Sequence, residues 1–136
     1  MKSKNQILAK EWILKADKDL EVSGILLKKR SRYLDVASFH CQQAFEKYLK
    51  STIVNNGIVP EKTHLLENLL NKVLEYDLRF VKWMDAAREI SPYAIIPRYP
   101  DEKFDITTPK LRKLIKKTDE LGNLVKEIVR TNLKKI

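Results

Sequence analysis

Apolar residues recur at steps of three and four through most of the chain, which is the period of an amphipathic α-helix. No alternating apolar and polar run competes strongly as a strand. The pattern therefore predicts an all-α fold, an antiparallel, up-and-down bundle of four to five helices. The predicted helices cover residues 6–27, about 35–54, 63–74 and 78–91, followed by a long last helix that begins after Asp105 or Thr107.

Polar residues and prolines set the expected boundaries of these helices. Asp35 and Thr63 are suited to cap the second and third helices through their side-chain oxygens. Asn56 or Gly57 is suited to the left-handed position that ends the second helix. The fourth helix should end at residue 91, because the span 92–101 contains three prolines and is expected to be extended or turning.

The length of 136 residues predicts one domain, residues 1–136, with a single core. Cys41 is the only cysteine and lies on an apolar helix face, so it is expected to pack as a small hydrophobe. A single cysteine excludes a disulfide or a multi-cysteine metal site within the chain, and we expect no cofactor. The N-terminal segment is too often interrupted by charges for a signal peptide or membrane span, which favours a cytoplasmic protein.

The charge balance favours an acidic partner. The formal net charge is +9 and the isoelectric point is near 9.6, so nucleic acid is the first candidate and an acidic protein the second. A lysine-rich helix can equally be a solvated surface, and charge alone does not decide between these interpretations. Much of the excess lies in the last helix, at Lys110, Arg112, Lys113, Lys116, Lys117, Lys126, Arg130, Lys134 and Lys135.

The second predicted helix carries the most informative polar line. At about 100° per residue, His40, Gln43 and Lys47 align opposite or beside the apolar face. An imidazole, an amide and an ammonium in one line can hydrogen-bond an anion or a base, so these residues are candidate ligand-binding groups. The alternative is the ordinary solvated side of an amphipathic helix. Glu46 and Lys50 also form an ordinary pair four residues apart.

Two further places could contact a nucleotide. Lys62 and His64 flank the predicted Thr63 cap, where a phosphate would meet a cation, an imidazole and free amides at a helix start. Arg98 and Tyr99 offer a cation and a ring that could stack on a base, or could instead hold the proline-bounded loop on the core.

Four stretches in this order and spacing resemble the HEPN domain, a helical domain of prokaryotes and higher eukaryotes that is linked to nucleotide binding. They are residues 12–20, 39–50, 62–64 and 94–101. The resemblance implies a compact bundle of four or five helices, often a homodimer. It also implies a partner, a separately encoded minimal nucleotidyltransferase, with which the domain forms a two-component, toxin–antitoxin-like module.

One branch of the family resembles toxin ribonucleases in which an arginine and a histidine are separated by four to six residues. Neither His40 nor His64 follows an arginine at that interval. The nearest imitation is Arg88 with Tyr93, a weak catalytic candidate because a phenol with a pKa near about 10 transfers protons poorly at neutral pH. The sequence therefore favours a non-catalytic subunit that binds nucleotide or RNA. The alternatives are a diverged ribonuclease and a helical interaction module.

Overall fold

The computed structural model describes residues 3–29, 31–95 and 106–134. These ranges contain only helical elements joined by turns and loops, and no strand. The all-α prediction is confirmed. In chain order the elements are α1 (Lys4–Lys29), the 3₁₀ turn η1 (Ser31–Tyr33), α2 (Leu34–Asn55), α3 (Leu66–Leu74), the 3₁₀ helix η2 (Leu78–Trp83), α4 (Met84–Ile90), the 3₁₀ turn η3 (Ser91–Ala94) and α5 (Thr108–Lys134).

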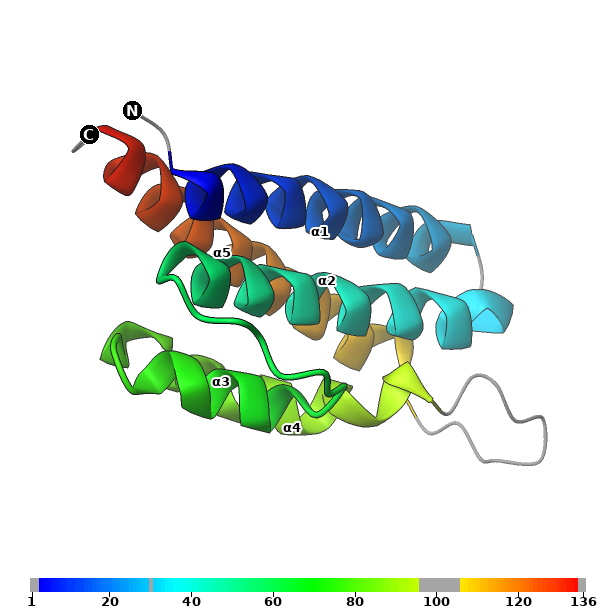
Figure 1. The fold of residues 1–136 in the computed structure, drawn as a ribbon. Coiled ribbons are helices and arrows are strands. Elements are labelled where there is room, and N and C mark those ends of the chain that lie inside the picture. Colours follow the sequence, from blue (N-terminus) through cyan, green and yellow to red (C-terminus); the bar gives the residue numbers. More distant parts are fainter. Residues whose placement is uncertain (1–2, 30, 96–105, 135–136) are drawn as a thin grey trace.

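Three long helices form the main layer of the bundle. Helices α1 and α2 run antiparallel across η1, and α5 packs against both of them (Figure 1). The beginning of α1 and the end of α5 lie at the same end of the molecule, so these two helices are also antiparallel. Helices α3 and α4 cover the other side of α2. Helix α2 is thus the centre of the fold, in the arrangement expected of an antiparallel bundle.

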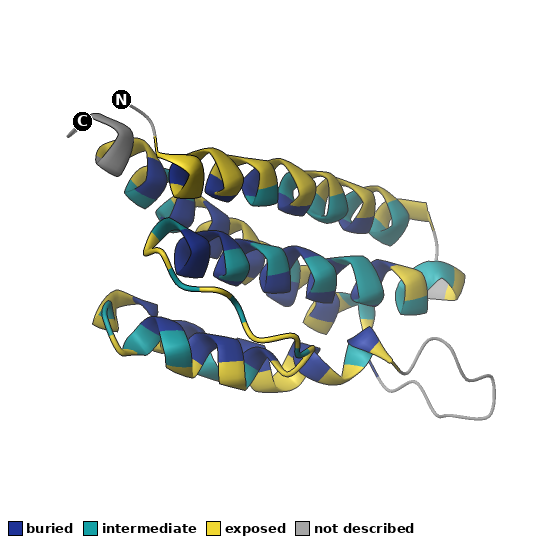
Figure 2. Cartoon of the chain, in the orientation of Figure 1, coloured by how far each residue is buried: buried dark blue, intermediate teal, exposed yellow. Residues whose placement is uncertain are grey.

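The central place of α2 explains why its apolar side is broad. Burial along this helix extends over most of its circumference, whereas α1 keeps an exposed outer face (Figure 2). Removing these side chains from water is the main stabilising contribution, at about 25 cal/mol per Å² of apolar surface. The largest fully buried side chains include Phe45, Tyr48, Leu49 and Ile53 from α2, Leu66, Leu69 and Leu70 from α3, Phe80 from η2, and Leu111 and Leu121 from α5.

Gly57 ends α2 in the left-handed conformation, with φ of 77°. The amide of Gly57 donates to Val54 O at 2.9 Å, and the amide of Ile58 donates to Ile53 O at 3.3 Å. These two bonds form the Schellman arrangement, which satisfies carbonyls that the last helical turn would leave free. The sequence predicted either Asn56 or Gly57 for this left-handed position, and the structure has Gly57 there.

Both predicted side-chain caps are wrong. Helix α2 begins at Leu34, because η1 leads directly into it, and Asp35 lies within the first turn, where Oδ1 accepts from the Val36 amide at 2.8 Å. Helix α3 begins only at Leu66, and Thr63 Oγ1 instead accepts from the Leu65 amide at 3.1 Å in the turn before the helix.

The predicted fourth helix is divided into three parts. The chain forms η2, then α4, and then η3, which contains Pro92. Pro92 was expected to begin an extended segment, but it stands at the start of a 3₁₀ turn, where its missing N–H is not needed. Asp77 supplies the cap of η2, since its Oδ1 accepts from the Arg79 amide at 3.0 Å. The rest of the predicted extended span, residues 96–101, lies outside the described residues.

Cys41 lies in the α2–α5 contact and has no solvent exposure, as expected from its position on the apolar face. Its Sγ is 3.5 Å from Thr118 Oγ1. Burial raises the pKa of the thiol to about 12, and the hydrogen bond to Thr118 opposes this only in part.

We expect Cys41 in the folded protein to react with a thiol reagent at pH 8 at least about a thousandfold more slowly than in the unfolded chain. The thiolate is the reacting form, and a pKa far above the solution pH leaves almost none of it. Reaction with an aromatic disulfide reagent, followed by absorbance with and without urea, measures this ratio. Rapid labelling without urea would show that α2 and α5 separate locally in the native state.

Candidate functional site

Asp19 of α1 brings together two of the three polar residues predicted on α2. Its Oδ1 is 2.9 Å from His40 Nδ1, and its Oδ2 accepts a hydrogen bond from Lys47 Nζ. All three side chains are largely buried, with exposed fractions of 14% for Asp19, 27% for His40 and 22% for Lys47. We call Asp19, His40 and Lys47 the Asp19 cluster. It joins α1 to α2 at the edge of their contact.

The Asp19 cluster leaves reactive atoms open. When Nδ1 of His40 carries the proton, it donates to Asp19 and the carboxylate fixes the tautomer, so that Nε2 is the free ring nitrogen. Within the described part of the chain, Nε2 has no hydrogen-bond partner. The ring of Phe39 meets His40 edge to face, with centroids 5.4 Å apart. A carboxylate-held imidazole beside an ammonium can accept or donate a proton and can hydrogen-bond an anion.

Gln43, the third member of the predicted line, points elsewhere. Its Nε2 donates to Gln42 Oε1 at 2.8 Å. Gln42 in turn donates to Glu46 Oε1 at 3.3 Å and to the carbonyl of His64 at 3.2 Å. The amide of Gln43 therefore belongs to a second polar group. Of the three predicted residues, His40 and Lys47 bind the Asp19 carboxylate, whereas Gln43 is linked through Gln42 to the Glu46 carboxylate.

Glu46 is the centre of this second group, although its side chain is only 5% exposed. Oε2 accepts from Lys50 Nζ at 3.0 Å, and Oε1 is 2.9 Å from Nδ1 of His64. We call Gln42, Glu46, Lys50 and His64 the Glu46 cluster. The expected pairing of Glu46 with Lys50 is present, but it is a buried network and not a surface pair. It fastens the segment before α3 onto α2.

Ser91 completes the attachment of this segment. Its Oγ donates to the His64 carbonyl at 3.2 Å and accepts from the Leu66 amide at 2.9 Å. The first amide of α3 is therefore already bonded, and the imidazole of His64 is directed towards Glu46. A phosphate at this helix start would have to compete with Ser91 for the Leu66 amide. Lys62 is exposed and forms no ion pair within the described ranges.

The weak catalytic candidates belong to α4 and η3. Arg88 is exposed on α4 and is 3.7 Å from Asp85, an ordinary pair three residues apart. Tyr93 lies in η3 and packs in part against the core. Arg88 therefore pairs within its own helix and not with either cluster. Arg98 and Tyr99 lie outside the described residues.

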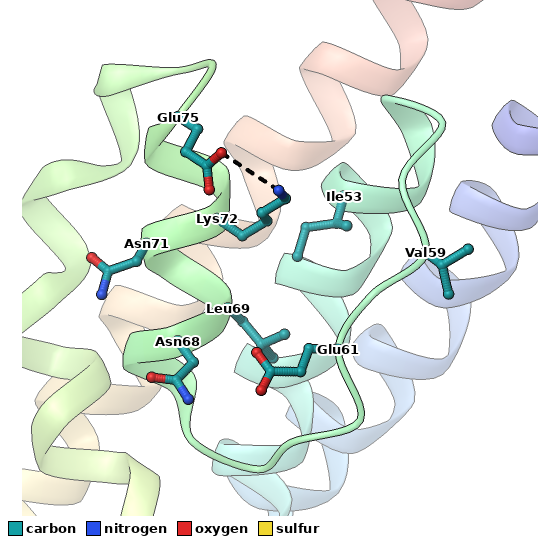
Figure 3. A pocket seen from close by; sticks show the side chains of 8 residues that line it. All are labelled: Ile53, Val59, Glu61, Asn68, Leu69, Asn71, Lys72 and Glu75. Atoms are coloured by element: carbon teal, nitrogen blue, oxygen red, sulfur yellow. Dashed lines mark hydrogen bonds and ion pairs between the residues drawn. The ribbon is translucent and has the colours of Figure 1, made fainter.

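A cavity of about 420 Å³ lies between α3 and the segment that follows α2 (Figure 3). Asn68, Glu61 and Leu69 lie near one another on one side of it, and Lys72 reaches Glu75 at 3.4 Å on the other. Neither histidine lines this cavity. Within the described ranges, no three His, Cys, Asp or Glu side chains are grouped so that they could hold a metal ion.

Sequence reasoning missed the two residues that organise the candidate site. Asp19 belongs to one of the stretches that resemble the HEPN domain. Its role depends on a contact with His40 of α2, which is 21 residues away in the sequence. Glu46 was expected to pair with Lys50 on its own helix, and its contact with His64 was not anticipated. Neither Asp19 nor Glu46 stands out in the sequence around it, since acidic residues are common on amphipathic helices.

Comparison with known proteins places both clusters within one family domain. Residues 9–128 match the family model described as HEPN domain. The chain belongs to the HEPN domain family. The match includes the Asp19 and Glu46 clusters, and it confirms the resemblance inferred from the sequence. The HEPN chain described here contains no helix, within its described residues, of the length and apolarity that a membrane crossing requires.

The HEPN chain is also similar to a curated protein of Methanocaldococcus jannaschii that is named "Putative toxin MJ1304". The two are 31% identical over 104 residues, a region that covers 71% of this chain. The same region covers 66% of the Methanocaldococcus jannaschii protein, just under two thirds of its length.

Proposed function

We propose that this HEPN chain is the nucleotide- or RNA-binding subunit of a two-component, toxin–antitoxin-like module. Its partner would be a separately encoded minimal nucleotidyltransferase. Membership of the HEPN family over residues 9–128 supports the class of protein. Similarity to a protein named as a putative toxin supports the module. A net charge of +9 suits an acidic ligand such as a nucleotide or RNA.

The Asp19 cluster is the observation that best supports binding. Asp19 holds the His40 ring and the Lys47 ammonium at fixed positions, so that a ligand need not order them. Nε2 of His40 and the remaining N–H groups of Lys47 are suited to the oxygens of a phosphate or to a base edge. Their partial exposure leaves them accessible from solvent.

Titration with a nucleotide panel and a short single-stranded RNA, followed by calorimetry, tests this proposal. We expect saturable binding, and we expect His40→Ala and Lys47→Met each to weaken it by about tenfold, the effect of losing one charge-assisted hydrogen bond. Lys116→Met is the matched control, because Lys116 is exposed on α5, far along the sequence from the cluster. The absence of heat at millimolar ligand, or equal binding by all variants, would contradict the proposal.

The partner is tested separately from the ligand. We expect the chain to co-purify with a minimal nucleotidyltransferase encoded beside its gene when both are expressed together. Sedimentation of the chain alone measures whether it is a homodimer, as is common in the family. Failure to co-purify would remove the partner from the proposal and leave nucleotide binding to be decided by the titration.

A diverged ribonuclease is the second candidate, and the paired Asp19 and His40 are the observation in its favour. A carboxylate that orients an imidazole is the arrangement used to activate a hydroxyl group as nucleophile. In cleavage of RNA, Nε2 would take the proton of the 2′-hydroxyl. Incubation with cellular RNA distinguishes the two functions. Cleavage that is lost in His40→Ala, Arg88→Ala or Arg98→Ala would establish the enzyme.

A further inference from the structure

A groove of about 460 Å³ runs between α1 and α5, on the part of the bundle where α1 begins and α5 ends. Its floor is apolar and consists of Ile13, Leu14 and Val129. Three cationic side chains complete its lining, those of Lys10, Lys126 and Arg130. The groove combines an apolar floor with a basic rim, a combination that neither of the two polar clusters has.

Helix α1 continues this apolar surface beyond the groove. Ile7 and Leu14 are 48% and 62% exposed and lie seven residues apart, which places them on one face of the helix two turns from each other. Single exposed apolar residues are normal on a protein surface. Ile7 and Leu14 instead lie beside an apolar groove, with the charged residues Lys10 and Glu11 between them on the same face. Apolar side chains that are grouped in this way and bordered by polar residues mark interaction sites.

The charges of the rim are largely uncompensated. Lys126 is 2.9 Å from Asp17 and shares that carboxylate with the hydroxyl of Tyr48. Lys10 and Arg130 are exposed and have no ion pair among the described residues. The charged residues that line the groove are therefore all cationic, and an apolar partner that carries carboxylates on its flanks would complement them.

We propose that this groove binds an acidic amphipathic helix of a partner protein. Two antiparallel helices leave a furrow along their contact, and a third helix fits it by placing apolar residues at i, i+3 or i+4 and i+7 on the floor. Acidic residues beside that apolar stripe then reach Lys10 and Arg130. A nucleic acid backbone would gain little from Ile13, Leu14 and Val129, which is why the floor selects a protein segment.

This interaction is separate from the nucleotide binding proposed above. The groove lies between α1 and α5, and the Asp19 cluster lies between α1 and α2. Either proposal can fail without the other, because different residues carry them.

The test uses the full chain and a synthetic, end-capped 18-residue peptide as probe. The peptide carries leucines in a 3–4 spacing, glutamates on both flanks and alanines elsewhere, with a fluorophore for anisotropy. We expect saturable binding that weakens at least about tenfold in Leu14→Glu and in the double variant Lys10→Glu, Arg130→Glu. A matched peptide with lysines in place of the glutamates should not bind.

Two control variants carry the same types of substitution, leucine to glutamate and lysine to glutamate, at positions outside the groove lining. Leu78→Glu alters a residue that is 76% exposed on η2, and Lys116→Glu reverses an exposed charge on α5. Both should bind the acidic peptide as the wild type does. The proposal is overturned by absence of binding at millimolar protein, or by equal binding of both peptides. It is also overturned if Leu14→Glu abolishes self-association of the chain, or binding of anionic lipid vesicles, and leaves peptide binding unchanged.

Discussion

Replacing Gly122 with alanine is expected to lower the free energy of unfolding by about 2 kcal/mol. A Cβ at this position would lie 2.6 Å from Cζ of Tyr48 and 2.9 Å from its hydroxyl oxygen. Real Cβ atoms do not approach carbon so closely, so the ring would have to move. Tyr48 is 1% exposed and occupies the centre of the bundle, where α5 crosses α2. A well-packed core resists such a shift.

Moving the Tyr48 ring would also break a hydrogen bond that joins two helices. The hydroxyl of Tyr48 donates to Asp17 Oδ1 at 2.5 Å, and Lys126 reaches the same oxygen at 2.9 Å. Burial, together with the contact to Asp17, raises the pKa of Tyr48 well above its usual range, so the phenol remains a donor at neutral pH. The cost of overpacking and of this lost bond exceeds the gain of about 1 kcal/mol from the better helix propensity of alanine.

Gly24 provides a control that carries the same substitution. It lies within α1, and nothing lies within 4 Å of a Cβ built on it. Gly24→Ala should therefore raise the free energy of unfolding by up to about 1 kcal/mol through helix propensity alone. Urea unfolding followed by circular dichroism compares the two variants. If they shift stability in the same direction, Gly122 is not needed for the close approach of α5 to α2.

The long helices could be predicted because each has one apolar face and one polar face that repeat over many turns. The predicted boundaries of α2 and the predicted start of α5 are within one or two residues of the structure for this reason. The region 78–94 could not be predicted as well. Its apolar residues do not all face the core, since Leu78 and Val81 are exposed while Phe80 and Trp83 are buried.

The sequence predicted only part of the candidate site. Helical geometry alone placed His40 and Lys47 on one line, and the structure brings both to one carboxylate. That carboxylate belongs to another helix, and no rule of local spacing identifies it. The same holds for Glu46, whose partner His64 comes from outside its own helix and is held in place by Ser91. Contacts between helices, which single-helix patterns do not encode, decide which polar residues become functional groups.

Removing Glu46 is expected to have the largest effect on stability of any single polar substitution in the chain. We expect Glu46→Ala to lower the free energy of unfolding by about 3 kcal/mol, at the low end of the range for breaking a buried ion pair. Lys50, whose side chain is only 15% exposed, would lose its partner, and Gln42 would lose an acceptor. The contact of Lys50 with Trp12, whose ring centroid lies 5.5 Å from Lys50 Nζ, would remain in the variant, so the lysine would not lose every partner.

His64 contributes less to this cost, because its side chain is 58% exposed and water can replace the carboxylate. The double-mutant cycle of Glu46→Ala with Lys50→Met, measured by urea unfolding at pH 7, isolates the energy of the pair from the effect of each truncation. Glu46→Gln keeps the shape of the side chain and removes its charge. Its free energy of unfolding should therefore lie between those of the wild type and Glu46→Ala.

Glu75 provides the matched control, since it pairs with Lys72 at 3.4 Å and both side chains are exposed, at 63% and 43%. Glu75→Ala should cost less than about 0.5 kcal/mol, because solvent screens a surface pair and its side chains are free to move. Glu46 on α2 would then contribute several times more to the free energy of unfolding than the exposed Glu75. If Glu46→Ala costs no more than Glu75→Ala, the apolar contacts and the hydrogen bonds of Ser91 are sufficient to hold the segment before α3, and the Glu46 carboxylate has no structural role.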